Sequence, residues 1–345
     1  MVRLTDFDYD LPDDLIAQTP LPDRAASRLL HLDPKTCEVT HRMFRDVVEI
    51  LNPGDVLVLN NTRVNAWRFR GTKPSGGEVE ILALKEIEPG IFECLIKPAK
   101  RLKPGAIFHL ADGVTGTVLP NRENPKDDDP IRIVQLTCEE GDLNSKLAGI
   151  GEVPLPPYIT EKLDDSERYQ TVFSESNGSA AAPTAGLHFT QEILDALVKK
   201  GAKIATVTLH VGIDTFRPIQ VDDVTNHQMH GEVCEISPAA AEIINGATGK
   251  IVAVGTTAVR TLESFATEYR SVEPGRKISR LFITPGYEFK VVDGMFTNFH
   301  FPRTTMLLMI SALSSREAIL SAYQEAIEKK YRFLSFGDSM LLFKA

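Results

Sequence analysis

Hydrophobic and polar positions follow two different patterns along this chain of 345 residues. Between residues 64 and 150, short apolar runs alternate with Gly and Pro turns, and no helical period is present. Strands at roughly ten-residue spacing are typical of a small antiparallel barrel or sandwich. The predicted strands are 78–84, 91–96, 106–110, 114–119 and 131–136, and the acidic stretch 121–130 is expected to be an exposed loop.

After Pro154 the pattern indicates strands that alternate with amphipathic helices. Thr190 can cap a helix whose apolar residues share one face and which Gly201 can end. The predicted strands are 56–59, 204–209 and 251–255, and the predicted helices are 190–200, 238–245, 258–269 and 314–330, the last with Ser314 and Glu317 as a capping box. The wholly apolar strand 251–255 is expected to be central and parallel.

These patterns predict an α/β main domain with an all-β domain, a small antiparallel barrel, inserted into it. The main domain would be discontinuous, formed by residues 1–62 and 154–345, and the inserted barrel would cover residues 63–153. A chain of this length is about right for two domains.

A formal net charge of −9 argues against a protein that coats nucleic acid over its whole surface, but it leaves room for one basic face. One segment has that character. Lys97, Lys100, Arg101 and Lys103 follow one another with no acidic residue between them. The segment is either a solvated hairpin face or a strip that contacts nucleic-acid phosphates.

Four scattered cysteines, none at CxxC spacing, argue against a zinc site and a disulfide framework and favour a reducing cytosol. The N-terminus lacks the basic start and apolar run of a signal peptide, and the longest apolar stretch, 306–313, is too short to span a bilayer. HExxH, GxSxG, P-loop and GxGxxG motifs are absent. This argues against zincins, serine hydrolases, NTPases and dinucleotide oxidoreductases.

Four polar segments are flanked by apolar strands, as active-site loops often are: 178–190, 209–218, 255–264 and 297–305. Three of them contain the histidines His188, His210 and His300. Each histidine is either a proton-transfer group or a structural residue satisfied by its neighbours. Arg260 and Glu263 lie three residues apart on a predicted helix and can pair with each other.

The sequence also resembles, in ordered blocks along nearly its whole length, the S-adenosylmethionine:tRNA ribosyltransferase-isomerase family of bacterial queuosine biosynthesis. The blocks are residues 6–12, 16–20, 23–30, 155–159, 168–173, 181–190, 208–218, 255–264, 285–287 and 297–300, together with the basic segment. The chain departs from the family pattern at Asn61, where Asp is usual, at Ile213–Asp214, where small residues are usual, and at 232–234, where a more aromatic stretch is usual.

The resemblance implies that the ribosyl part of S-adenosylmethionine is transferred to 7-aminomethyl-7-deazaguanine at the wobble position of tRNA. The product is epoxyqueuosine, and adenine and methionine are released. S-adenosylmethionine is then a substrate, and no metal or tightly bound cofactor is expected. The implied partner is the anticodon loop of tRNA, whose target base must leave the stack. We expect a cytoplasmic monomer with no membrane contact.

This chemistry needs groups that accept protons near working pH, which suits histidine. We hypothesise that His188, His210 and His300 divide the proton transfers, with His230 in reserve. The aromatic or acidic neighbours of the sulfonium would be Tyr169, Phe189 and Glu263. The methionine carboxylate or tRNA phosphates would be held by Arg24, Arg63, Arg217, Arg260 and Arg303, and Thr184 and Asn298 complete the expected substrate-binding set.

Two other functions remain compatible with the residues. An S-adenosylmethionine-dependent RNA methyltransferase would release S-adenosylhomocysteine and leave the ribose untouched. A non-catalytic RNA-binding protein would bind without turnover. The concentration of His, Thr and Arg at strand-to-helix turns disfavours the second alternative.

Overall fold

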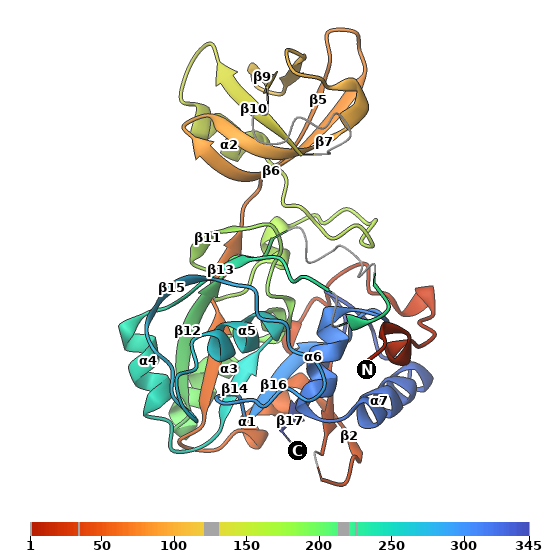
Figure 1. The fold of residues 1–345 in the computed structure, drawn as a ribbon, viewed down its shortest axis with the longest axis vertical. Helices are drawn as coiled ribbons and strands as arrows, with labels where there is room; N and C mark the ends of the chain where they lie inside the picture. Colours follow the sequence, from red (N-terminus) through yellow and green to blue (C-terminus); the bar gives the residue numbers. More distant parts are fainter. Residues whose placement is uncertain (1, 34, 121–130, 213–220, 225–226, 345) are drawn as a thin grey trace. The chain divides into compact units, whose positions relative to one another are not determined.

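A computed structural model describes residues 2–33, 35–120, 131–212, 221–224 and 227–344 (Figure 1). The chain forms two compact units, residues 64–155 and residues 1–63 with 156–345. The expected exposed loop 121–130 and the segment that contains Asp214 and Arg217 lie outside the described residues. No helix of the described part is long and apolar enough to cross a membrane.

The smaller unit is a closed antiparallel barrel with the strand order β10-β7-β6-β5-β8-β9. Its strands are β5 (Arg68–Thr72), β6 (Glu78–Glu88), β7 (Ile91–Lys97), β8 (Ile107–Leu110), β9 (Val114–Leu119) and β10 (Ile131–Cys138), followed by α2 (Leu143–Ile150). Alternate residues point into the barrel, where Phe69, Phe92 and Phe108 are buried. The barrel confirms the predicted fold, but β5 was not predicted, because Phe69 is its single large apolar residue.

The larger unit contains a nine-stranded sheet with the order β15-β13-β12-β3-β14-β16-β17-β1-β2. The strands are β1 (Arg28–Leu32), β2 (Val39–Met43), β3 (Val56–Asn60), β12 (Lys203–Leu209), β13 (Glu232–Ile236), β14 (Ile251–Val254), β15 (Gly275–Ser279), β16 (Gly294–Asn298) and β17 (Ser339–Phe343). A two-stranded sheet pairs β4 (Thr62–Val64) with β11 (Ser176–Ser179). The adjacent strands β12, β3, β14 and β16 are parallel, so their carboxyl ends share one edge of the sheet.

Both faces of this sheet are covered, which explains why its central strands are continuously apolar. In β3, Val56 and Val58 belong to one hydrophobic cluster, whereas Leu57 and Leu59 belong to the other. The helices are α1 (Val47–Ile50), α3 (Gln191–Lys200), α4 (Pro238–Asn245), α5 (Thr256–Ser264), α6 (Thr305–Leu313) and α7 (Arg316–Glu328). Single-turn 3-10 segments, among them η7 (Thr184–His188), connect several of these elements.

Local capping signals located most of these helices. The Thr190 side chain accepts a hydrogen bond from the Ile193 amide (3.4 Å), and Gly201 ends α3 with φ of 101°. The Ser237 side chain likewise accepts from the Ala240 amide (3.2 Å) at the start of α4. Both predicted helices are confirmed at these ends.

Two other helix predictions were wrong at their ends. Helix α5 begins at Thr256 and ends at Ser264, five residues before the expected Tyr269. Helix α7 is capped by Ser315, whose side chain accepts from the Ala318 amide (3.1 Å), so the predicted capping box of Ser314 and Glu317 is wrong. Ser314 instead ends α6, a helix that was not predicted because its nearly continuous apolar run shows no amphipathic period.

Candidate active site

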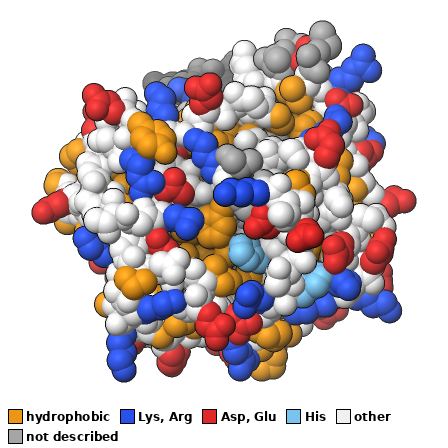
Figure 2. Space-filling view, turned by 90° about the horizontal axis from the view of Figure 1, so that it is seen from below, with side chains coloured by type: hydrophobic (Ala, Val, Ile, Leu, Met, Phe, Trp, Pro, Cys, Tyr) orange, Lys and Arg blue, Asp and Glu red, His pale blue; other side chains and the backbone are white. Residues whose placement is uncertain are grey.

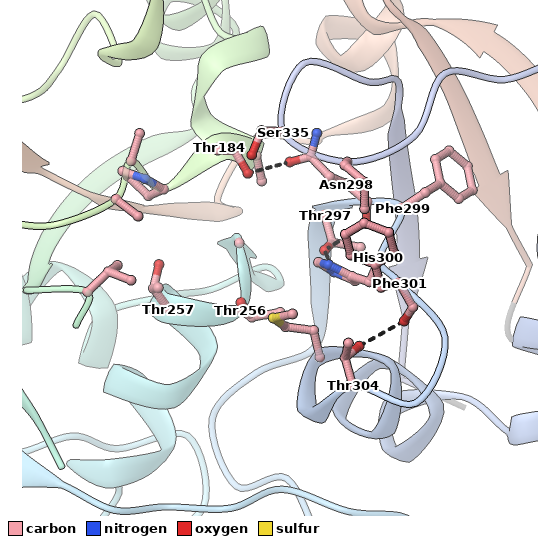
Figure 3. Close-up of a pocket in the computed structure, with 18 of the residues that line it drawn as sticks. Thr184, Thr256, Thr257, Thr297, Asn298, Phe299, His300, Phe301, Thr304 and Ser335 are labelled. Carbon is pink, nitrogen blue, oxygen red and sulfur yellow. Dashed lines mark hydrogen bonds between the residues drawn. The ribbon is translucent and has the colours of Figure 1, made fainter. Parts of the chain in front are cut away.

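The larger unit contains a cavity of about 650 Å³ beside the carboxyl ends of β14 and β16 (Figure 3). This volume is within the range typical of sites for small ligands. The cavity is lined by Leu4, residues 157–158, Tyr169, residues 181–185, Val211, residues 255–257, residues 297–304, Met306 and residues 334–335. In open α/β sheets, ligands bind at this edge. All four polar segments singled out in the sequence therefore contribute to one cavity, the second of them through Val211 alone.

The turn from β14 to α5 brings backbone and hydroxyl groups to the cavity wall. Gly255 has φ of 87°, a conformation that side chains disfavour, and it lets α5 begin directly after the strand. Thr256 and Thr257 therefore start the helix at the cavity, as Figure 3 shows. The free N–H groups of a helix start attract anionic or polar ligand groups.

Asn60, at the end of β3, ties this turn to the neighbouring strand. Its side-chain amide donates to the Leu209 carbonyl and to the Thr257 hydroxyl, both at 3.1 Å. Its side-chain oxygen accepts from the amides of Thr62 (3.2 Å) and Leu209 (3.0 Å). Asn60 is buried, and the sequence offered no signal for this role beyond its place after an apolar strand.

His300 lines the cavity from the loop between β16 and α6. Its Nε2 lies 2.7 Å from the Thr297 hydroxyl, which can donate its own proton to the Asn298 carbonyl (3.2 Å). The hydroxyl then accepts from Nε2–H, which leaves Nδ1 as the nitrogen with a free lone pair. No described residue donates a hydrogen bond to Nδ1. Burial lowers the pKa of His300 to about 4, so the ring is neutral near pH 7.

Two tyrosines hold the backbone of His300. The Tyr9 hydroxyl donates to the His300 carbonyl, and the Tyr323 hydroxyl accepts from the His300 amide (3.1 Å). The two rings also pack edge to face, with centroids 5.2 Å apart. Neither tyrosine was singled out in the sequence, because one lies in the N-terminal segment and the other in α7.

His188 is buried behind the cavity wall and does not line the cavity. Its Nδ1 lies 2.8 Å from the Ser27 hydroxyl and its Nε2 lies 3.2 Å from the Asn298 amide nitrogen. Burial, with the charges of Arg24 and Arg332, lowers the pKa of His188 to about 3. Its two nitrogens are therefore occupied by protein groups.

His210 and His230 also lie outside the cavity lining. His210 Nδ1 lies 2.9 Å from the Thr62 hydroxyl, and its ring packs against Gly178. Burial and the charge of Arg276 lower its pKa. His230 Nε2 lies 3.4 Å from a carboxylate oxygen of Glu232.

Among the three residues expected beside a sulfonium, only Tyr169 lines the cavity. Phe189 packs instead in the core against Phe44 and Phe296. The Glu263 carboxylate is buried and accepts four hydrogen bonds, at 2.9–3.1 Å, from the Tyr287 hydroxyl and the amides of residues 290–292. The structure therefore makes Phe189 and Glu263 parts of the fold and not of the cavity wall.

Comparison with known proteins identifies the family to which this chain belongs. The family model described as "Queuosine biosynthesis protein" matches residues 4–342. The chain belongs to this family.

Relatives in the queuosine biosynthesis family cover the chain from end to end. An S-adenosylmethionine:tRNA ribosyltransferase-isomerase from Clostridioides difficile is 48% identical, over 99% of this chain and 100% of that protein. One of the same name from Desulforamulus reducens is 47% identical, with the same coverage. The crystal structure of an S-adenosylmethionine tRNA ribosyltransferase from Thermotoga maritima is 34% identical, covers 98% of this chain and 100% of its own, and superposes with a TM-score of 0.55.

The arginines that were expected to bind substrate lie in different parts of the larger unit. Arg303 lines the cavity and pairs with Asp8. Arg24 donates to the carbonyls of residues 167, 170 and 187, and Arg63 pairs with Glu167. Arg260 pairs with Glu232 of β13, so the expected pairing with Glu263 is wrong. The two α5 side chains reach different neighbours, which sequence spacing alone could not reveal.

The basic segment of this chain lies exposed on the barrel. The side chains of Lys97, Lys100, Arg101 and Lys103 are all exposed, and Lys97 lies 3.4 Å from Glu80. By contrast, Figure 2 shows a face of the molecule on which acidic and basic side chains are interspersed. Within the described residues, no group of three or more His, Cys, Asp or Glu side chains could hold a metal ion.

Proposed function

We propose that this chain is an S-adenosylmethionine:tRNA ribosyltransferase-isomerase. It would transfer the ribosyl moiety of S-adenosylmethionine to 7-aminomethyl-7-deazaguanine at the wobble position of tRNA, isomerise it to give epoxyqueuosine, and release adenine and methionine. Membership of the queuosine biosynthesis family and the activity named for its end-to-end relatives support this proposal. The observation that carries it is the cavity at the carboxyl ends of β14 and β16, which has the size for a nucleoside-containing substrate.

His300 is the proposed proton acceptor in this cavity. The sulfonium of S-adenosylmethionine acidifies the neighbouring C5′ hydrogens, and a base that removes one of them gives an ylide. The Thr297 hydroxyl fixes the tautomer of His300 so that Nδ1 keeps its lone pair. Burial keeps the ring neutral at neutral pH, so the Nδ1 lone pair is available, but the lowered pKa also makes His300 a weaker base than an ordinary histidine.

The other cavity residues would bind and orient S-adenosylmethionine. Tyr158, Tyr169 and Phe301 supply aromatic surface for the sulfonium and the adenine. The Thr184, Thr256, Thr257 and Ser335 hydroxyls supply polar groups for the ribose. Arg303, on the cavity wall, is the proposed partner of the methionine carboxylate.

The barrel is proposed to bind tRNA. Lys97, Lys100, Arg101 and Lys103 would contact backbone phosphates near the anticodon loop. Arg24, Arg63 and Arg260 bond to protein groups and, unlike Arg303, do not line the cavity, which argues against a direct substrate contact. We also propose that the barrel folds as an inserted domain and that the protein acts as a cytoplasmic monomer without a tightly bound cofactor.

Product analysis tests the proposed function. Purified protein is incubated with S-adenosylmethionine and tRNA that carries the aminomethyl-deazaguanine, and small molecules and digested tRNA are analysed by mass. Free adenine and methionine, with a ribosyl-derived mass on the wobble base, are expected. S-adenosylhomocysteine with a methylated nucleoside would indicate a methyltransferase, and salt-sensitive tRNA binding without turnover would indicate a binding protein.

A further inference from the structure

A chain of four polar side chains leads from the buried interior to the cavity wall. It runs from Ser27, next to β1, through His188 at the end of η7 and Asn298 at the end of β16, to Thr184 at the start of η7. Ser27 and His188 are buried away from the cavity, whereas Asn298 and Thr184 line it. Figure 3 shows the last link, between Thr184 and Asn298.

The direction of every hydrogen bond in this chain can be assigned. The Ser27 hydroxyl donates to the Arg24 carbonyl (3.3 Å), so it accepts from Nδ1–H of His188. The neutral His188 ring then has a lone pair on Nε2, which accepts from the Asn298 amide nitrogen. The Asn298 side-chain oxygen accepts from the Thr184 hydroxyl at 3.0 Å.

The chain therefore fixes which way the Asn298 amide points. If the amide were reversed, its oxygen would face the His188 lone pair, and its NH₂ would replace the acceptor of Thr184. His188 also borders a cavity of only about 30 Å³, room for little more than a water molecule. Its ring packs on Phe44, with centroids 5.0 Å apart. Both ring nitrogens bond to protein groups and the ring does not line the larger cavity, so within the described residues the link from His188 to that cavity is Asn298.

We propose that His188 is a positioning residue that orients the Asn298 amide, so that one amide N–H and the Thr184 hydroxyl oxygen face the bound ribosyl donor. This inference rests on the proposed function. A hydroxyl oxygen that donates to Asn298 keeps its lone pairs for the ligand, and the second amide N–H of Asn298 remains a donor. The pair fits a ligand group that both donates and accepts, such as a ribose hydroxyl.

Two substitutions at one position test the inference. Gln places a side-chain oxygen near the position of Nε2 and can still accept from Asn298, whereas Asn reaches only the position of Nδ1. We expect His188→Gln to keep kcat within about threefold of the wild type. His188→Asn should lower kcat on the order of tenfold or more, since small misplacements of substrate-orienting groups are costly. The KM for S-adenosylmethionine should change less than kcat.

A serine pair provides the matched control. Ser27→Ala removes the acceptor of Nδ1–H, whereas Ser311→Ala removes a hydroxyl that has no hydrogen-bond partner within the described residues, and both serines are 3% exposed. Ser27→Ala should lower kcat severalfold and Ser311→Ala should leave it unchanged. This comparison remains decisive if the His188 variants fail to fold, which thermal unfolding reports.

Three results would overturn the inference: equal losses in His188→Gln and His188→Asn, equal behaviour of the two serine variants, or loss of the acidic limb of the pH–rate profile in His188→Gln. The last result would make His188 a proton-transfer group. Release of adenine by the wild type is measured in parallel. Its absence would refute the proposed function, whereas normal release with any of the three results would refute only the role of His188.

Discussion

The cavity of the larger unit and the basic segment of the barrel differ in burial and in charge. The cavity is lined mainly by apolar groups, hydroxyls, an amide and a neutral histidine, with Arg303 as its one charged side chain among the described residues. The basic segment places four cationic side chains on an exposed surface. Buried neutral groups act over short distances and are little affected by salt, whereas exposed charges act over a Debye length and are screened. Chemistry and tRNA affinity should therefore respond to different substitutions and different conditions.

The largest effect is expected in the cavity. His300→Gln removes the proposed proton acceptor, and loss of a general base typically costs 10²- to 10⁴-fold in rate. We therefore expect kcat to fall by about that factor at every salt concentration, with tRNA affinity unchanged. Single-turnover assays of adenine release and a tRNA-binding titration measure the two quantities. His109→Ala, an exposed histidine of the barrel, is the control and should leave kcat unchanged.

The same histidine predicts a pH dependence. Its pKa in the folded protein is about 4, below its ordinary value of 6.5. The ring gains a proton only as the pH falls toward 4, so its contribution to kcat should be constant above about pH 5. Because the unfolded chain binds this proton first, stability should also decline as the pH falls from 6.5 to 4. An inflection near pH 6.5 that is lost in His300→Gln would contradict this assignment.

The next effect is expected on the barrel. Replacing Lys97, Lys100, Arg101 and Lys103 together by Gln should weaken tRNA binding at least tenfold at low salt. It should also reduce the slope of log affinity against log salt by about three to four, because each phosphate contact releases counterions. Saturating tRNA should restore kcat. Four exposed lysines elsewhere, Lys85, Lys199, Lys203 and Lys329, give a control of equal charge. If the control variant lost as much tRNA affinity as the variant of the basic segment, binding would depend on net charge and not on this segment.

Local signals in the sequence predicted much of this fold, and the resemblance to the family predicted its function. Thr190, Ser237 and Gly201 act on amides and turns within a few residues, so their effects can be read from the sequence. The same holds for the period-two pattern of the barrel strands. The prediction failed where a neighbouring element sets the position of a cap. Ser315, not Ser314, caps α7, because Ser314 is the C-cap residue of the preceding helix α6.

The roles of site residues were harder to predict, because residue type does not reveal partners. The sequence grouped His188, His210 and His300, yet only His300 lines the cavity. Nor could it show that Tyr9 and Tyr323, far apart in the chain, meet at the peptide of His300. Such contacts depend on the topology of the sheet and its connections.

A stability effect without a catalytic effect is expected at Glu263. Glu263→Gln replaces one carboxylate oxygen by NH₂, which then faces N–H or O–H donors and leaves them unsatisfied. Unsatisfied buried groups cost about 1–3 kcal/mol, so the free energy of unfolding should fall by that amount. Urea unfolding measures it, with the exposed Glu242→Gln on α4 as the control. A large loss of kcat in the folded variant would instead indicate that Glu263 takes part in the reaction.

The smallest effect is expected at Asn61, where the family usually has Asp. Asn61 lies beside Asn60 but outside the cavity lining. Its side-chain oxygen accepts from the Thr208 hydroxyl (2.7 Å) and its amide donates to Glu175 (3.4 Å). Asn61→Asp keeps the first bond and replaces the second by repulsion between a half-buried carboxylate and the exposed one of Glu175, which is worth little where water reaches the pair. We expect kcat to change less than threefold, and Glu175→Gln to reverse that change. A loss of kcat above tenfold would mean that this position contacts the reacting groups and that the active site extends to the residue that follows β3.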